Sequence, residues 1–100
     1  MKKTIVVVCE SKQCSDKLIE AGKILDINIK CETQFEEKIV NELSINDINN
    51  SVAVLFAVDK SIEEIEKIER FIDFEYYEVE PKHILLDAKS VLNEILTDIN

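Results

Sequence analysis

The sequence predicts an α/β domain built on an open, four-stranded parallel sheet with helices on both faces. Two continuous apolar runs indicate this, the β-branched run at residues 5–8 and the run at residues 52–58. Runs this short and apolar throughout are typical of central parallel strands covered on both faces. Helix-period segments lie between and after the strands, so the order is βαβαβαβα. Such alternation, with right-handed crossovers, gives a Rossmann-like three-layer sandwich.

The first half of the chain begins with the strand at residues 5–8. Apolar residues at helical spacing then predict a helix over residues 16–25, with Ser15 or Asp16 as its N-cap. Residues 27–31 alternate apolar and polar side chains, the period of a strand with one face in water. We therefore expect this second strand at an edge of the sheet.

The middle of the chain contains a helix signal followed by the second central strand. Ser44 and Asp47 are spaced as in a capping box, so a short helix should begin at Ser44 and turn Ile45 and Ile48 inward. The apolar run at residues 52–58 then follows as a strand.

The last third repeats the alternation. Residues 62–71 predict a helix with a strongly acidic outer face, and its buried stripe extends to Ile72. Residues 76–79 read as a fourth, short strand. Pro81 suits the first turn of a last helix that runs to about Ile99.

The length and composition of the chain exclude several classes of protein. At 100 residues the chain predicts a single domain, 1–100, and its 46% hydrophobic and 33% charged residues are typical of a globular protein. No apolar run approaches the roughly 20 residues that a transmembrane helix needs, so we expect no direct membrane insertion. The N-terminal charges lead into only four strongly apolar residues, which does not fit a signal peptide.

The number of cysteines indicates the redox compartment, and the net charge indicates which partners are compatible. Three cysteines, an odd number in a chain without a disulfide-scaffold pattern, fit a reducing compartment, and we expect a cytoplasmic protein. The net charge of -9 argues against nucleic acid and anionic membrane surfaces as partners. It is compatible with a basic protein partner.

The loop after the first strand is where this fold predicts a ligand. In open parallel sheets, ligands bind at the carboxyl ends of the strands. Here that position is the segment from Cys9 to Ser15, which reads C-E-S-K-Q-C-S.

Four blocks of the chain form a recognisable pattern, namely I-K-C-E-T-Q at residues 29–34, N-E-L-S at 41–44, D-I at 47–48 and the apolar strand that ends near Asp59. In sequence and spacing these blocks resemble the fructose-type IIB domains of the bacterial phosphoenolpyruvate-dependent sugar phosphotransferase system. The family's R-F segment, last strand and last helix are similar to residues 70–71, 77–79 and 91–92, after a small insertion around residues 61–64.

The resemblance implies a reaction and partners. A IIB domain accepts a phosphoryl group on a cysteine from a IIA domain and passes it to a sugar held by the membrane-embedded IIC domain, with no cofactor and no metal. The chain would then be a phosphotransferase with Cys9 as the catalytic residue. Backbone N–H groups of the following loop would bind the phosphate. These belong to Glu10, Ser11, Lys12, Gln13, Cys14 and Ser15.

The chain departs from the family at this loop, which in the family reads C-P-T-G-I-A-H-T. The Pro, Gly and His are missing, and the first helix is shorter by about five to seven residues. Counting from the N-terminus places Cys9 at the nucleophile, whereas aligning the apolar strand places Ser11 there. Cys14 is a further candidate, and a Cys9–Cys14 redox pair is an alternative whose spacing is not C-x-x-C.

The remaining candidate residues have simpler interpretations. Cys31 fits packing on a strand, and His83, the only histidine, fits a surface or capping role. The acids at residues 63–69 and 75–80 are spread over solvated faces rather than gathered as metal ligands.

Two functions follow from the sequence. The first is an active phosphoryl carrier, and the second is a catalytically silent IIB-like domain that binds or regulates a partner. The residual cysteine favours the first and the altered loop favours the second.

Overall fold

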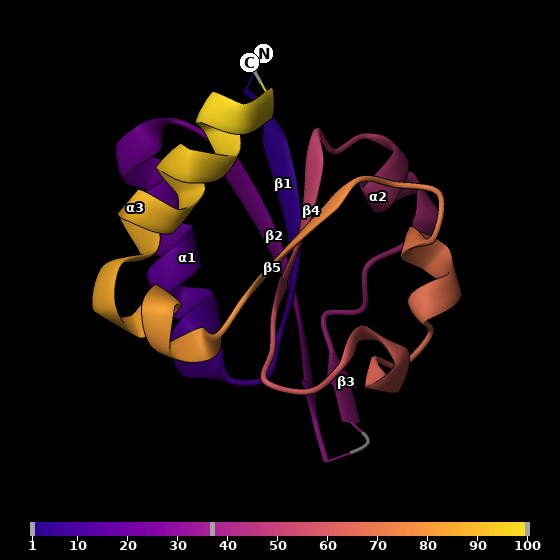
Figure 1. The fold of residues 1–100 in the computed structure, drawn as a ribbon. Coiled ribbons are helices and arrows are strands. Elements are labelled where there is room, and N and C mark those ends of the chain that lie inside the picture. The colour runs from indigo at the N-terminus through magenta and orange to yellow at the C-terminus, as the bar shows by residue number, and fades with distance from the viewer. Residues whose placement is uncertain (1, 37, 100) are drawn as a thin grey trace.

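The computed structural model describes residues 2–36 and 38–99 and has an α/β fold (Figure 1). Its strands are β1 (Thr4–Cys9), β2 (Asn28–Phe35), β3 (Lys38–Val40), β4 (Ala53–Ala57) and β5 (Tyr76–Val79). Its α-helices are α1 (Lys12–Leu25), α2 (Ile45–Asn49) and α3 (Pro81–Ile99), and two short 3-10 helices are η1 (Ile62–Glu64) and η2 (Ile68–Phe71). Among these, no helix is long and apolar enough to cross a bilayer.

The sheet has β1 at its centre and the strand order β3-β2-β1-β4-β5. Strands β2, β1, β4 and β5 are parallel, as predicted, and β3 is antiparallel to β2. The prediction of four strands is therefore one short. Strand β2 continues to Phe35, beyond the end of β1, and β3 pairs with this overhang. The second strand is consequently internal, and the prediction of an edge strand was wrong.

Helices cover both faces of the sheet and give the three layers that the alternation predicts. Helices α1 and α3 lie together on one face, while α2 and the 3-10 segments lie on the other (Figure 1). Strand β1 alternates its side chains between two cores. Ile5, Val7 and Cys9 belong to the core under α1 and α3, whereas Val6 and Val8 belong to the core on the opposite face.

Helix α1 begins four residues earlier than predicted. Ser11 is its N-cap, with an extended backbone and a side-chain oxygen that accepts a 3.2 Å hydrogen bond from the Cys14 N–H. The expected caps, Ser15 and Asp16, instead lie inside the helix. Both serines are good N-cap residues, and the sequence did not separate them. The connection between β1 and α1 is therefore only Glu10 and Ser11.

The predicted capping box at Ser44 is present. The Ser44 N–H donates to Asp47 Oδ2 at 3.0 Å and the Asp47 N–H donates to Ser44 Oγ at 3.0 Å. Ile48 is fully buried as expected, but Ile45 is exposed. Ile45 is the first residue of this five-residue helix, and Ile48, about one turn further on, is the side chain that reaches the core.

The helix predicted over residues 62–71 is instead two 3-10 turns. Ile65 is extended and Lys67 adopts the left-handed conformation at φ 56°, so the α-helix cannot continue through them. The Gln34 side chain explains the break, because it accepts from the Glu66 N–H at 2.9 Å and donates to the Glu66 carbonyl at 3.1 Å. Ile72, expected in the buried stripe, is exposed.

Strand β5 and helix α3 have the predicted bounds, with one irregularity. Asp87 leaves the helical conformation at φ -161° and ψ 78°, so α3 consists of two helical pieces. The Asp87 carboxylate accepts a 3.1 Å hydrogen bond from the Ser90 N–H and thereby caps the second piece.

Candidate functional site

Cys9 is the last residue of the central strand β1. It is paired with Thr33 of β2 on one side and with Ala57 of β4 on the other. It therefore lies at the carboxyl edge of the sheet, where a parallel α/β fold places its ligands. Its side chain is fully buried, on the face covered by α1 and α3.

Three oxygen atoms surround the Cys9 thiol. Sγ lies 3.5 Å from Thr33 Oγ1 and 3.6 Å from the carbonyl oxygens of Ser11 and Glu32. The carbonyls can only accept, whereas the threonine hydroxyl can also donate to sulfur. Of these three oxygen atoms, the Thr33 hydroxyl is therefore the one that can stabilise a thiolate.

The surroundings of Cys9 lower its pKa to about 7. A hydrogen bond with the Cys31 thiol is the largest cause, burial opposes it, and the contacts of Thr33 and Ser11 lower the pKa further. The negative charge of Glu10 raises it. A thiol with this pKa is about half ionised at neutral pH, and the thiolate is the nucleophilic form.

All three cysteines lie in one core cluster, which the sequence did not reveal. Cys31 and Cys9 occupy alternate positions along neighbouring parallel strands, so they share a face. The hydrogen bond with Cys9 and burial raise the pKa of Cys31. Burial also raises the pKa of Cys14. Cys9 is thus the thiol of the three that ionises near neutral pH.

The predicted phosphate-binding residues lie next to Cys9, but they form a helix start rather than an open loop. Ser11 caps α1, and its carbonyl accepts from the Ser15 N–H at 3.2 Å. Lys12 forms a 3.0 Å ion pair with Asp16 within the helix. Gln13 also lies in the first turn.

Two contacts close the site on its other sides. The Glu10 carboxylate accepts a 2.6 Å hydrogen bond from the Asp59 N–H, which joins the segments that follow β1 and β4. The Cys14 thiol donates to the Pro81 carbonyl at 3.8 Å and so contacts the start of α3. His83, two residues further on, lines a groove between α3 and β5. Across residues 2–36 and 38–99, no three His, Cys, Asp or Glu side chains are grouped as metal ligands.

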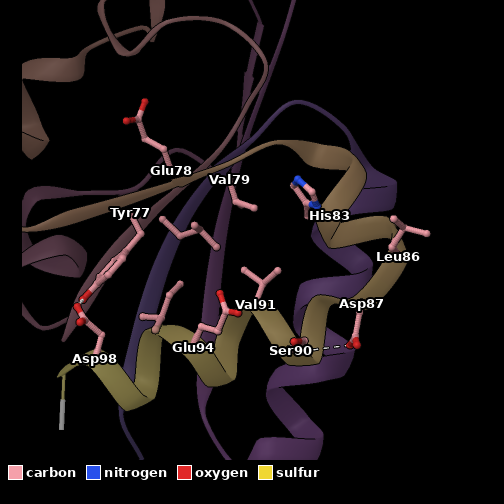
Figure 2. Close-up of a pocket in the computed structure, with 12 residues that line it drawn as sticks. Tyr77, Glu78, Val79, His83, Leu86, Asp87, Ser90, Val91, Glu94 and Asp98 are labelled. Atoms are coloured by element: carbon pink, nitrogen blue, oxygen red, sulfur yellow. Dashed lines mark hydrogen bonds between the residues drawn. The ribbon is translucent and has the colours of Figure 1, made fainter.

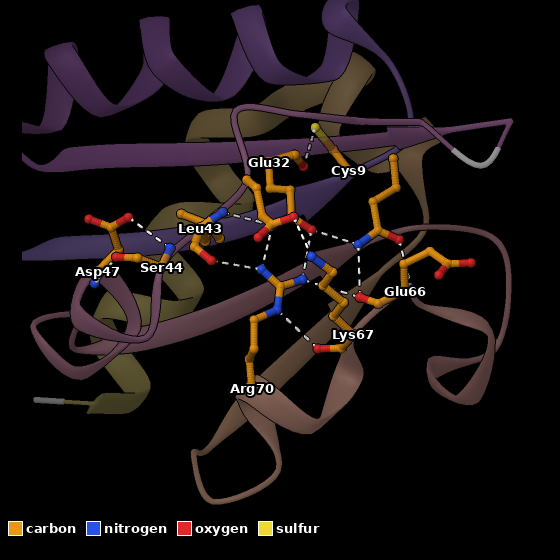
Figure 3. Close-up of polar contacts among 10 residues, drawn as sticks. Cys9, Glu32, Leu43, Ser44, Asp47, Glu66, Lys67 and Arg70 are labelled. Carbon is orange, nitrogen blue, oxygen red and sulfur yellow. Dashed lines mark hydrogen bonds and ion pairs between the residues drawn. The ribbon is translucent and has the colours of Figure 1, made fainter.

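A buried ion pair lies on the opposite face of β2 (Figure 3). Glu32 is fully buried, and its two carboxylate oxygens accept from Arg70 Nη1 at 2.7 Å and Nη2 at 3.0 Å. The Leu43 N–H donates to the same carboxylate at 2.8 Å, and Gln34 Nε2 donates to it at 2.6 Å. Burial alone would raise the pKa of Glu32, but these hydrogen bonds outweigh it and hold the pKa below its usual value.

Arg70 extends this network to three backbone carbonyls in two other segments. It donates to the carbonyls of Leu43 at 2.8 Å, Glu66 at 3.2 Å and Lys67 at 3.0 Å. The residues of this network belong to the blocks E-T-Q, N-E-L and R-F, which resemble the IIB family in sequence. That these blocks contact one another was not predicted. Thr33 lies between Glu32 and Gln34, so the network holds the strand segment that lines Cys9.

The chain is similar to known proteins in its structure. No family model matches the sequence, and no curated protein matches it. A domain of a fructose-specific IIABC component of the phosphotransferase system from Borrelia burgdorferi is similar in structure, with TM-score 0.82 and 26% identity over 94% of this chain and 93% of that chain. The enzyme IIB subunit of a phosphotransferase system from Escherichia coli K12 gives TM-score 0.83 and 26% identity over 98% and 94%. An uncharacterized protein solved in solution gives 0.80 and 31% over 96% and 94%.

Replacing Glu32 by glutamine should strongly destabilise the fold. The Arg70 side chain, 10% exposed, would lose its counter-charge, and breaking a buried pair from one side costs about 3–5 kcal/mol. Glu42→Gln is the matched control, because Glu42 pairs with Lys67 at 2.8 Å in an exposed position, where such pairs contribute under about 1 kcal/mol. Urea denaturation measures both changes. Equal effects from the two variants would contradict a structural role for Glu32.

The lowered pKa of Cys9 predicts how its thiol ionises with pH. Because the thiol is fully buried, its ionisation is followed through the ¹³Cβ signal, which requires no reagent to reach the sulfur. The Cys9 signal should titrate with a midpoint near 7, whereas Cys14 and Cys31, whose pKa values are raised, should titrate only at higher pH. Thr33→Val removes the hydroxyl and should move the Cys9 midpoint upward. A wild-type midpoint for Cys9 at about 8.5, the ordinary value, would refute the prediction.

Proposed function

The chain is a fructose-type IIB domain of the sugar phosphotransferase system, and from this premise we propose that Cys9 carries the phosphoryl group from a IIA component to a sugar at IIC. The observation that supports the proposal most is the lowered pKa of the Cys9 thiol at the carboxyl end of the central strand. The partners are the IIA and IIC components, and the place of action is the cytoplasm.

Each transfer exchanges one bond at phosphorus for another. The Cys9 thiolate attacks the phosphorus of a phosphohistidine on IIA, so a P–S bond forms, the P–N bond breaks and the imidazole keeps the electron pair. A sugar hydroxyl then attacks the same phosphorus, gives up its proton, and displaces the Cys9 thiolate. The thiolate is thus both nucleophile and leaving group, and a low pKa favours both roles.

The residues around Cys9 support this chemistry in different ways. Thr33 Oγ1, at 3.5 Å, can donate to the thiolate before and after transfer. The positive N-terminal end of the α1 dipole begins at Lys12, three residues after Cys9, and favours negative charge there. Glu10 opposes phosphate electrostatically, but its carboxylate is held by the Asp59 N–H.

Phosphate mapping tests the proposal. The protein is incubated with phosphoenolpyruvate, enzyme I, HPr and a fructose-type IIA component, and the labelled residue is identified by mass spectrometry. Label is expected on Cys9 and should be lost in Cys9→Ser. It should remain in the matched variant Cys14→Ser. Label on Ser11 or Cys14 in the wild-type protein would overturn the assignment to Cys9.

A second function is favoured by one specific observation. The Cys9 thiol is fully buried, and only Glu10 and Ser11 connect β1 to α1. A silent IIB-like domain that binds a partner fits this burial. Absence of label at all three positions, with the wild-type protein folded and still binding IIA, would establish this function instead.

A further inference from the structure

A groove of about 680 Å³ lies between β5 and α3 (Figure 2). It arises because α3 packs mainly against α1 and leaves the near face of β5 thinly covered. Tyr77 and Val79 line it from the strand, and Leu86, Val91 and Ile95 line it from the helix. The groove therefore has an apolar floor.

One side of the groove is the outer edge of the sheet. Strand β5 pairs with β4 on one side, and in the part of the chain that the structure describes its other edge has no strand partner. Extended peptides can add as a further strand to an unpaired sheet edge of this kind. The groove thus fits an extended segment rather than a helix.

The charge of the groove is negative. Asp87, Glu94 and Asp98 line it from α3, and none of the twelve lining residues is lysine or arginine. Leu86, the residue before the break in α3, is next to Asp87 and is 81% exposed. An occupant with complementary chemistry has alternating basic and apolar side chains.

The groove begins close to the candidate site. Val79 pairs with Ala57, and Ala57 pairs with Cys9, so only one strand separates the end of β5 from the cysteine. The Cys14 contact with Pro81 also joins the start of α3 to the helix that follows Cys9. A partner seated in the groove would therefore lie next to the phosphoryl acceptor.

We propose that the β5–α3 groove binds an extended basic segment on the cytoplasmic face of the IIC component, a proposal that rests on the proposed function. Cytoplasmic loops of membrane proteins carry an excess of lysine and arginine, which complements the three carboxylates of α3. A second copy of this chain is a poor occupant, because it brings the same acids and a net charge of -9.

The first test uses a synthetic hexapeptide of alternating lysine and valine, with a glutamate-valine hexapeptide as the charge control. Titration into the ¹⁵N-labelled protein should shift amide signals of β5 and of the second piece of α3. Glu94→Gln should weaken binding by about threefold, the scale of one exposed charge pair, and Glu63→Gln, an acid outside the groove, should not. Equal binding of the acidic peptide, shifts elsewhere, or self-association through β5 would each overturn the proposal.

The second test addresses the partner and separates this proposal from the function on which it rests. Detergent-solubilised fructose-type IIC should displace the lysine-valine peptide from the wild-type protein. Cys9→Ser should still bind both, and Glu94→Gln should still accept phosphate from IIA. IIC binding that leaves the peptide in place overturns the partner assignment. Peptide displacement by IIC without label on Cys9 contradicts the phosphoryl-carrier function alone.

Discussion

The buried pair of Glu32 and Arg70 is the interaction on which the rest of the structure depends. A fully buried carboxylate is costly unless it is paired and hydrogen-bonded, and here four donors from Arg70, Leu43 and Gln34 satisfy it. The pair joins β2 to the segment before α2 and to the 3-10 turns. These are the segments that complete the core on the face opposite α1 and α3.

The same pair also affects the candidate site, because side chains alternate along a strand. Glu32 and Gln34 point to one face of β2, and Thr33 between them points to the other, where its hydroxyl contacts Cys9. The Glu32 carbonyl contacts the same sulfur. A network that holds the backbone at these residues therefore holds the environment of the thiol, although its own side chains do not touch it.

Local pattern predicted much of the fold. Strands β1 and β4 and the capping box at Ser44 depend on neighbouring residues, and all three are present. The exception at residues 62–71 involves a residue distant in sequence. The Gln34 side chain forms two hydrogen bonds with the backbone of Glu66, 32 residues away. These bonds interrupt a segment whose pattern predicted a helix. Such a contact has no signal in the periodicity of residues 62–71.

At the candidate site, too, the features that depend on neighbouring residues were predictable and those that depend on distant residues were not. The carboxyl end of β1 was predictable from the alternation of strands and helices, and Cys9 lies there. The proximity of Cys31 was not predictable, because it depends on the register between β1 and β2. That register places the two thiols on one face and separates their pKa values. A two-residue link, Glu10 and Ser11, follows Cys9, and the thiol is buried in the core under α1 and α3.

The pKa of Cys9 in an Arg70→Lys variant tests most directly whether the buried pair controls the thiol. Lysine keeps the positive charge but cannot form the bidentate hydrogen bonds that Arg70 makes with Glu32. Titration of the ¹³Cβ signal of Cys9 should give a pKa near 7 in the wild-type protein and a value closer to the ordinary 8.5 in Arg70→Lys. The exposed variant Lys67→Gln should leave it unchanged. A folded Arg70→Lys protein whose Cys9 still titrates near 7 would contradict this account.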